Sequence, residues 1–355
     1  METTQEQTVR LTQLSHGGGC GCKIAPNILE EILSSELKFA PPHNLVVGNS
    51  SKDDAAVYDM GDGTGIISTV DFFTPIVDDP FDYGRIASAN AISDVYAMGG
   101  KPLMAIAILG WPVEKLSTSI AQKVLEGSRT ICALAGIPMA GGHSIDSPEP
   151  IFGLSVTGTI PIKNVKKNNT AKEGDLLFLT KPLGVGILST AQKKGALKPE
   201  HLASFIDQLI QLNKVGEALG KCDVVTAMTD VTGFGLSGHL IEMGEGSGLS
   251  AEIYYSRGPV HENAREYLAQ RLIPDATYRN WNSCSKKISF EKGVNVMEAF
   301  SILPDPQTNG GLLIAVDPAG KESVQKILAD HGYLQFLEPI GKFTSETDKR
   351  VVVKV

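Results

Sequence analysis

The sequence predicts an α/β protein (α+β, with mixed sheets) of two domains. The chain has 355 residues, more than most single hydrophobic cores can organise. Strand-like and helix-like apolar patterns occur in mixed order in both halves, which favours mixed sheets with helices on one face. A segment rich in lysine and asparagine, Lys163 to Lys172, separates the halves. We therefore expect a flexible glycine-rich arm at 1–24, an N-terminal domain at 25–162 and a C-terminal domain at 163–355.

The elements of the N-terminal half follow from apolar spacing and from the residues that begin and end helices. Pro26 is suited to the first position of a helix, and Gly99-Gly100 ends another. Helices are expected at Pro26–Leu37, Tyr83–Met98 and Ser117–Ala135. Strands are expected at Leu45–Val47, Ala55–Tyr58, Gly65–Val70, Leu103–Leu109 and Ile151–Ile160, while Ile137–Ala140 leads into the segment Gly141–Ser144.

The helix at Tyr83–Met98 is apolar almost all round, which predicts that it is buried. Asn90, Ser93 and Asp94 nevertheless lie three and four residues apart and form one polar stripe. A buried carboxylate without a partner costs several kcal/mol or more. We therefore expect a positive charge beside Asp94.

The C-terminal half predicts a second α/β unit of similar size. Its strands are expected at Asp175–Thr180, Val224–Met228, Gly311–Val316, Phe336–Phe343 and Val351–Val355. Its helices are expected at Gly184–Lys193, Pro199–Leu219, Leu236–Met243, Pro259–Gln270 and Lys321–His331.

Composition and charge limit the classes of function. Hydrophobic residues make up 42% of the chain and charged residues 20%, as in ordinary globular proteins. The net charge of −8 argues against a duplex-binding surface, so nucleic acid is not an expected partner. Five cysteines are too sparse for a disulfide scaffold and fit a reducing cytosol. Met1–Leu14 has no apolar core of a signal peptide, and no apolar run approaches the roughly 20 residues of a membrane span, so we expect a cytoplasmic protein without membrane association.

The segment Ser15–Lys23 combines four glycines with Cys20, Cys22 and Lys23. Such a segment holds no fixed shape by itself, yet it can close over a ligand and bring a nucleophile and a cation to it. Lys23 is expected to lower the pKa of a nearby thiol and so favour nucleophilic or chalcogen chemistry. The alternatives are an unstructured tail, or a zinc site, which the C-x-C spacing disfavours. Cys132, in an apolar stretch, is expected to be a small buried hydrophobe.

Two glycine motifs suggest phosphate binding but match imperfectly. Gly17–Lys23 departs from the Walker pattern, because Cys22 separates Gly21 from Lys23 and Ile24 replaces the hydroxyl residue. Gly233–Gly238 matches G-x-G-x-x-G, with Glu252 about 20 residues on, but no clear βαβ series surrounds it. A tight turn against a packed helix explains the second motif better than a dinucleotide site does.

Aspartates lie at the expected ends of several elements. Singly, each could be a turn residue, a helix cap or a solvated charge. Together they form a set of oxygen ligands of the kind that Mg²⁺ prefers, and Mg²⁺ bridges to phosphates. We therefore expect a Mg²⁺–ATP site built from these aspartates, which are Asp53, Asp54, Asp71, Asp94 and Asp230.

The same segments resemble the selenophosphate synthetase (selenide, water dikinase) family over nearly the whole chain. Within the resemblance, Gly19-Cys20-Gly21-Cys22-Lys23 is the part specific to that activity. The aspartate and glycine segments are shared with the wider superfamily of aminoimidazole ribonucleotide synthetase and thiamine-monophosphate kinase. The matching segments are His16–Lys23, Asp53–Val57, Thr69–Phe73, Asn90–Pro102, Ala140–Asp146, Met228–Gly235 and Asp305–Gly311.

The resemblance implies an aminoimidazole-ribonucleotide-synthetase-like fold and a homodimer whose N-terminal domains pair into a barrel-like sheet. It implies the reaction of ATP, selenide and water to selenophosphate, AMP and phosphate, which supplies selenium for selenocysteine and selenium-modified tRNA. ATP is then a co-substrate and Mg²⁺ the cofactor, and a selenium-delivery protein is a further candidate partner.

The resemblance also implies roles for individual residues. Cys20 would be the essential thiol, and Lys23 would act in catalysis by contacting the phosphates. The Mg²⁺ ligands would be Asp54, Asp94 and Asp230. The nucleotide would be bound by Lys23, Ser51, Lys52, Asp53, Asp71, Asp94, Gly142, His143 and Ser144.

One segment departs from the family pattern, and two other functions stay open. Pro274–Arg279 lacks a Gly-Gly pair expected before the Thr-x-Arg-Asn segment, so the local loop geometry should differ. A kinase or amide-forming ATPase on the same fold would release ADP and leave Cys20, Cys22 and Lys23 without a purpose. A non-catalytic carrier of selenium or metal would leave the aspartates unused.

Overall fold

The computed structural model describes residues 9–15, 17–24, 26–34, 40, 42–49 and 52–355. Helix α1 covers Pro26–Leu33, and Ser34 is not helical. The last residues of the expected helix, 35–37, lie outside the described residues. No helix in the described part of the chain is long and apolar enough to cross a membrane.

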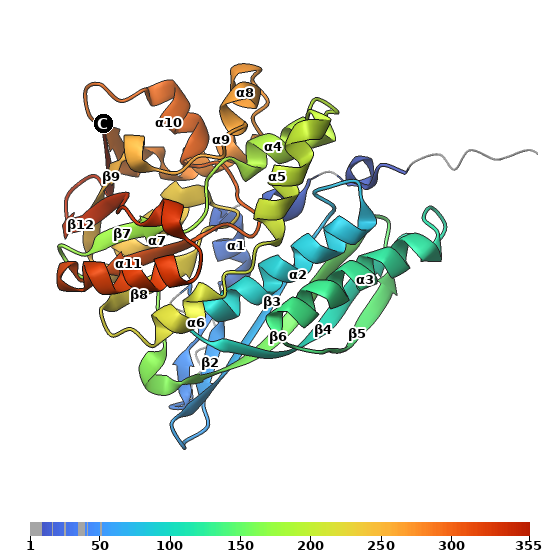
Figure 1. The fold of residues 1–355 in the computed structure, drawn as a ribbon, viewed down its shortest axis with the longest axis horizontal. Coiled ribbons are helices and arrows are strands. Elements are labelled where there is room, and N and C mark those ends of the chain that lie inside the picture. The colour runs from blue at the N-terminus through green and yellow to red at the C-terminus, as the bar shows by residue number, and fades with distance from the viewer. Residues whose placement is uncertain (1–8, 16, 25, 35–39, 41, 50–51) are drawn as a thin grey trace, which may run out of the picture.

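The N-terminal half forms one mixed sheet (Figure 1). Strands β4 and β5 are parallel, and the other neighbours are antiparallel. The strand order is β1-β2-β3-β6-β4-β5. The strands are β1 (Leu45–Val47), β2 (Ala56–Asp59), β3 (Thr64–Phe73), β4 (Lys101–Trp111), β5 (Met139–Asp146) and β6 (Ile151–Pro161).

Helices α2 (Pro80–Ala97) and α3 (Thr118–Ala135) cover one face of this sheet, as expected (Figure 1). Two glycines let these helices approach closely. A Cβ at Gly84 would lie 1.9 Å from the carbonyl oxygen of Val124, and one at Gly127 would lie 2.0 Å from that of Phe81. Helix α2 is buried along most of its length, as its apolar pattern predicts. The helix therefore carries its polar stripe into the interior.

The other face of the first sheet has apolar side chains that no described element covers. Val70 and Ile106 lie in one transverse row through Ser155, and both are about half exposed, at 53% and 47%. Phe72 and Met104 are similarly exposed. We call these four residues the outer apolar face. Such a patch is unusual on a monomeric surface.

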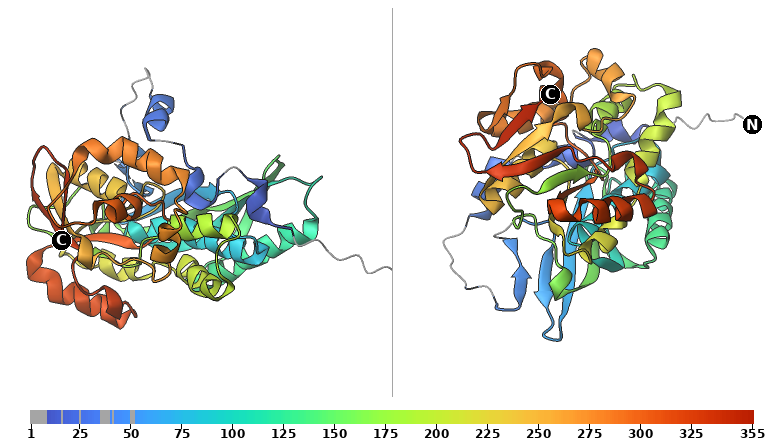
Figure 2. Two further views of the ribbon diagram at one scale, coloured as in Figure 1. Left: turned by 90° about the horizontal axis from the view of Figure 1, so that it is seen from above. Right: turned by 60° about the vertical axis from the view of Figure 1, so that its left-hand side comes forward.

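The C-terminal half forms a second sheet of order β10-β13-β9-β12-β7-β11-β8. Its strands are β7 (Leu176–Leu179), β8 (Val225–Asp230), β9 (Leu249–Tyr254), β10 (Ile288–Phe290), β11 (Leu312–Val316), β12 (Gly341–Ser345) and β13 (Val351–Lys354). Its helices are α4 (Val185–Lys193), α5 (Pro199–Ile210), α6 (Val215–Gly220), α7 (Gly235–Ser247), α8 (Ala264–Ala269), α9 (Asp275–Cys284), α10 (Val296–Ile302) and α11 (Lys321–Asp330). Figure 2 shows the two halves side by side, and buried residues of both join in one hydrophobic cluster.

Several expected boundaries were wrong, because tertiary contacts replaced local ones. The single helix expected at Pro199–Leu219 is interrupted between α5 and α6. There the Gln211 carbonyl accepts hydrogen bonds from Lys181 Nζ (2.7 Å) and Asn309 Nδ2 (2.9 Å) instead of continuing the helix. Strands β9 and β10 and helices α9 and α10 were not predicted. The strand expected from Phe336 begins only at Gly341, and Gly141–Ser144 belongs to β5.

Candidate active site

The glycine-rich arm docks between the two halves of the chain. It contains a 3₁₀ turn at Gly19–Cys22, which is held on both sides by hydrogen bonds. The Gly19 N–H donates to the Thr74 carbonyl (3.0 Å), and the Cys20 N–H donates to Thr308 Oγ1 (2.9 Å). Gly19 has φ +54°, and a Cβ there would lie 2.4 Å from Thr308 Oγ1. Glycine is therefore required at this position for close docking.

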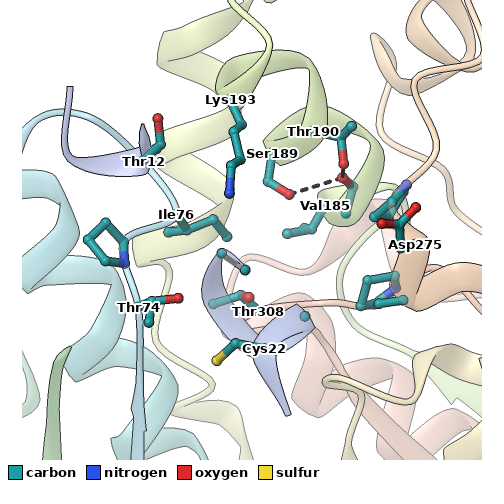
Figure 3. A pocket seen from close by; sticks show the side chains of 18 of the residues that line it. Thr12, Cys22, Thr74, Ile76, Val185, Ser189, Thr190, Lys193, Asp275 and Thr308 are labelled. Atoms are coloured by element: carbon teal, nitrogen blue, oxygen red, sulfur yellow. Dashed lines mark hydrogen bonds between the residues drawn. The ribbon is translucent and has the colours of Figure 1, made fainter. Parts of the chain in front are cut away.

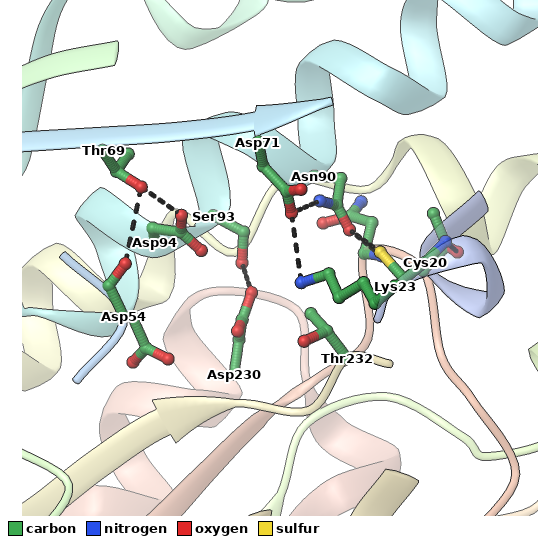
Figure 4. A network of polar contacts seen from close by, with 12 residues as sticks. Cys20, Lys23, Asp54, Thr69, Asp71, Asn90, Ser93, Asp94, Asp230 and Thr232 are labelled. Atoms are coloured by element: carbon green, nitrogen blue, oxygen red, sulfur yellow. Dashed lines mark hydrogen bonds and ion pairs between the residues drawn. The ribbon is translucent and has the colours of Figure 1, made fainter. Parts of the chain in front are cut away.

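The thiol of Cys20 points inward to Asn90 on α2 (Figure 4). Cys20 Sγ donates to Asn90 Oδ1 over 3.3 Å, and the Asn309 N–H donates to the same oxygen over 2.7 Å. Asn90 Nδ2 in turn donates to Asp71 Oδ2 (2.5 Å). One buried amide therefore joins the arm, the first sheet and the loop before β11. Cys20 is 1% exposed and Asn90 is fully buried.

The electrostatics of Cys20 differ from the sequence-based expectation. Burial raises the pKa of the Cys20 thiol far above its ordinary value, and the opposing effect of Lys23 is smaller. Desolvation disfavours the thiolate more than one partly exposed ammonium favours it. Cys20 is therefore held as a neutral thiol in this arrangement, and the expected lowering of its pKa was wrong.

Lys23 directs its ammonium group toward the aspartates (Figure 4). Its Nζ lies 3.6 Å from Asp71 Oδ2, and 38% of the side chain is exposed. Burial opposes the charge of Lys23, yet the aspartates around it, Asp71 first and then Asp94 and Asp230, raise its pKa above the ordinary value. Lys23 thus supplies the positive charge that the buried stripe of α2 requires. Asp71 lies within β3, which continues to Phe73 rather than ending before it.

Three further aspartates come together beside this pair, and each accepts a hydrogen bond from a hydroxyl group. Thr229 Oγ1 donates to Asp54 Oδ1 (2.8 Å), Thr69 Oγ1 to Asp94 Oδ2 (2.5 Å) and Ser93 Oγ to Asp230 Oδ2 (2.5 Å). We call Asp54, Asp94 and Asp230 the carboxylate cluster. They come from the loop before β2, from α2 and from the end of β8.

Burial and mutual repulsion make the carboxylate cluster unfavourable when it is fully ionised. Both effects raise the pKa values of Asp54 and Asp94 well above the ordinary range. Burial raises the pKa of Asp230 to about 6, against the lowering effects of Ser93 and Lys23. Such shifts, in which several carboxylates disfavour each other's charge, are typical of sites that take a cation.

The chemistry of the cluster fits Mg²⁺, although its three carboxylates do not surround one common metal position. Asp54 Oδ2 is buried and has no hydrogen-bond partner, so it is free for a cation. Among the described residues, no three His, Cys, Asp or Glu side chains already surround a single metal position. The three carboxylates come from separate elements, and each uses one oxygen to accept from its hydroxyl partner. The second oxygens are of the kind that suits a hard divalent ion.

The remaining expected nucleotide residues fall into two groups. Asp53 lies beside the cluster, where its Oδ1 accepts from the Asn168 N–H (2.7 Å), and Lys52 precedes it with φ 54°. Ser51 lies outside the described residues. Gly142, His143 and Ser144 are instead exposed on the edge strand β5, so the structure does not bring them to the cluster.

The register of the first sheet sets the distance of this second group from the site. Asp71 pairs with Leu154, Leu154 with Ala107 and Ala107 with Gly142. Three strand spacings therefore separate Asp71 from Gly142, which is about 14 Å.

Sequence reasoning missed the groups that position the site. Asn213 Nδ2 donates to Ser93 Oγ and to the Gly310 carbonyl, and Lys181 Nζ donates to the Asn309 carbonyl (2.8 Å). Burial lowers the pKa of Lys181 to about 7. The polar stripe of α2 was the available signal for Asn90 and Ser93. Nothing in the local sequence identifies Asn213 or Lys181, because their partners lie at least 30 residues away along the chain.

Comparison with known proteins agrees with this fold. The family model "AIR synthase related protein, N-terminal domain" matches residues 52–160, and the corresponding C-terminal model matches residues 172–354. Thiamine-monophosphate kinase from Stenotrophomonas maltophilia has a similar fold, with a TM-score of 0.63, 18% identity, and coverage of 88% of this chain and 91% of that one. The two halves thus define an AIR synthase related protein.

Full-length relatives make the assignment narrower. Selenide, water dikinase of Cronobacter sakazakii is 54% identical over 99% of both chains. That of Yersinia pseudotuberculosis is 56% identical over 98% of both. The chain belongs to the selenide, water dikinase family.

The first prediction concerns Asn90. Asn90→Ala removes the acceptor for Cys20 Sγ and the Asn309 N–H, and we expect a loss of about 2–4 kcal/mol in the free energy of unfolding. Without this anchor, alkylation of Cys20 should become about tenfold faster, while alkylation of exposed Cys22 stays unchanged. Mass spectrometry of timed alkylation measures both thiols in one sample. Asn282→Ala, at an exposed position on α9, is the control, and equal Cys20 rates in all three proteins would contradict the assignment.

The second prediction concerns His239 on α7, whose Nε2 accepts the Thr232 N–H (3.1 Å) just after β8. Burial lowers the pKa of His239 to about 3, so the folded chain keeps it neutral. Below about pH 6.5 the unfolded chain binds a proton at this histidine that the folded chain does not. The free energy of unfolding therefore decreases as the pH is lowered. The native chain should lose about 2 kcal/mol more than His239→Gln between pH 7.5 and pH 5. Denaturant unfolding at both pH values measures this, and parallel profiles would refute it.

Proposed function

We propose that this chain makes selenophosphate from selenide and ATP, and releases AMP and phosphate, as a selenide, water dikinase in the cytoplasm. The observation that carries the proposal is the docking of a thiol- and lysine-bearing arm against Asp71 and Asn90, beside the buried carboxylate cluster. Membership of the selenide, water dikinase family supports it independently. Free selenide as the phosphoryl acceptor accounts for a site that combines polar groups for a triphosphate with a buried thiol.

In this proposal Asp54, Asp94 and Asp230 hold Mg²⁺, which when bound neutralises and orients the triphosphate. Lys23 adds a mobile positive charge at the γ-phosphate, and Asp71 and Asn90 orient it. Asp53 and Lys52 contact the nucleotide at the same end of the sheet. Ser51, Gly142, His143 and Ser144 stay proposed contacts, the last three only for a nucleotide that extends across to β5.

The chemistry then needs positioning more than covalent help. Selenide attacks the γ-phosphorus in line, and ADP leaves; a loose phosphoryl-transfer transition state is stabilised chiefly by nearby positive charge. Water next cleaves ADP to AMP and phosphate in the same closed site. The docked arm keeps bulk water from the first transfer. Cys20, held as a neutral thiol against Asn90, is proposed as the essential thiol next to the incoming selenide.

The third prediction tests this function. Anaerobic ³¹P NMR of the native chain with Mg²⁺, ATP and selenide should show selenophosphate, AMP and phosphate in equal amounts. Cys20→Ala should lose selenophosphate formation by about a hundredfold or more, because the group at the selenide position is gone. Cys132→Ala, the same change at a buried thiol on α3, should keep it. ADP as the final product would favour a kinase on this fold, and full yield from Cys20→Ala would remove the essential thiol.

We further propose that the chain forms a homodimer through the outer apolar face, with two N-terminal sheets pairing into a barrel-like arrangement. The exposure of Val70, Phe72, Met104 and Ile106 on one sheet face supports this. The covering helices lie on the opposite face, so a second copy is the partner best matched in shape and polarity. A protein that delivers selenium is a separate candidate partner.

The fourth prediction tests the dimer. Ile106→Glu places a charge within the outer apolar face, and burying it should weaken self-association by about a hundredfold or more. Light scattering over a range of concentrations should find native dimers and Ile106→Glu monomers. Met297→Glu makes a similar change at a 75% exposed position on α10 and should leave the dimer intact. A monomeric native chain would end the proposal.

A further inference from the structure

The docked arm also forms one wall of a large cavity, which we call the arm cavity. Its volume is about 1090 Å³, and it lies between the two halves of the chain (Figure 3). Its other walls are the loop after β3, helix α4 and the start of helix α9. Cavities between α/β units are where small-molecule sites commonly form. The proposed reaction gives this cavity no task.

The arm separates this cavity from the carboxylate cluster. Cys20 Sγ faces Asn90 on the inner side, whereas exposed Cys22 lines the arm cavity. None of Asp54, Asp71, Asp94 and Asp230 lines the cavity. A Mg²⁺-bound triphosphate therefore belongs to the inner side, and the cavity needs a ligand of another kind.

Charge indicates the class of that ligand. The cavity is lined by four basic residues (Arg10, Lys193, Lys194 and Arg279), of which Arg10 is ion-paired with Asp78, and by two acidic ones (Glu149 and Asp275). The whole chain has the opposite balance, with 32 basic and 40 acidic residues. A local basic excess of this kind attracts anions. Arg279 Nη2 also donates to the Gly21 carbonyl (3.0 Å), and Lys193 Nζ to the Ser15 carbonyl (2.8 Å), so the same walls hold the arm.

The volume of the arm cavity restricts the class of ligand further. Cavities for drug-sized ligands occupy roughly 300–1,000 Å³. Selenide or phosphate would leave most of the arm cavity empty, whereas a tripeptide would occupy much of it. Cys22 adds a thiol that can exchange with a sulfur- or selenium-linked ligand. Volume, charge and thiol together select an anionic thiol compound of peptide size.

We propose that the arm cavity binds an anionic low-molecular-weight thiol compound that carries selenium, and that Cys22 receives the selenium. This inference rests on the proposed function, for which it names the form in which selenium arrives. The carrier is a selenotrisulfide, R–S–Se–S–R, in which R bears carboxylates. The basic residues bind the carboxylates and place the selenium near Cys22.

The transfer balances without an added oxidant. The Cys22 thiolate attacks selenium, a Cys22 S–Se bond forms, and one Se–S bond breaks as R–S⁻ leaves and takes up a proton. The adduct Cys22–S–Se–S–R then reacts with three thiols R–SH. These yield H₂Se, two disulfides R–S–S–R and free Cys22, so the thiols are oxidised as selenium is reduced to selenide. The selenide is released beside the arm, whose inner side carries Cys20.

The non-covalent part is tested with S-methylglutathione, an anionic tripeptide without a free thiol. It should slow alkylation of Cys22 by a neutral reagent and should bind in calorimetry. Lys194→Glu should weaken its binding about five- to tenfold, because a repulsive charge replaces an attractive one. Lys326→Glu makes the same change at an exposed position on α11, away from the cavity, and should bind as the native chain does. Equal binding by Lys194→Glu, or by the dimethyl ester of the probe, would overturn the inference.

The covalent part is tested with selenodiglutathione and mass spectrometry. The native chain should gain one selenium–glutathione adduct on Cys22, and excess S-methylglutathione should suppress it. Cys22→Ser should gain none. An adduct formed first on another cysteine, or one that S-methylglutathione does not suppress, would overturn the inference. Conversion of free selenide and ATP by the native chain is measured separately, so failure of the carrier site is distinguished from failure of the proposed reaction.

Discussion

The site depends on one electrostatic constraint, the confinement of several carboxylates in a buried space between two sheets. Burial raises the pKa values of Asp54, Asp94 and Asp230, and the nearby Asp230 raises those of Asp54 and Asp94 further. Separate hydroxyl groups hold each carboxylate, so the arrangement persists without strong ion pairs. The compensating charge comes from the docked arm, through Lys23.

Buried polar groups are also linked by hydrogen bonds across the two halves of the chain. Asn90 contacts the arm, the first sheet and the loop before β11, while Asn309 continues the contacts to Lys181 and α5. Buried polar networks of this kind are favourable only when every member is paired. A displacement of either half would therefore leave donors unpaired at the point where Cys20 docks.

The arm itself has two chemically different sides. Its inner side carries the neutral thiol of Cys20 and faces carboxylates. Its outer side carries the exposed thiol of Cys22 and faces basic residues. Glycines at 17, 18, 19 and 21 make this possible, since a Cβ at Gly19 would collide with Thr308 and one at Gly17 would lie 2.8 Å from the Cβ of Cys22. The two cysteines are thus separated by environment although only one residue lies between them.

The sequence by itself predicted the mixed α/β class and the buried helix α2 with its polar stripe, and it singled out the aspartates and arm residues that the structure brings near one another, because these follow from local periodicity and residue chemistry. It could not determine that helix α5 ends at Ile210, that β5 carries Gly142–Ser144 to an exposed edge, or that burial raises the pKa of Cys20 despite Lys23. Each of these depends on groups distant in sequence, such as Asn309 near Gln211 and Asn90 near Cys20. Desolvation and long-range hydrogen bonds exist only after the two halves pack, so the tertiary structure alone decided them.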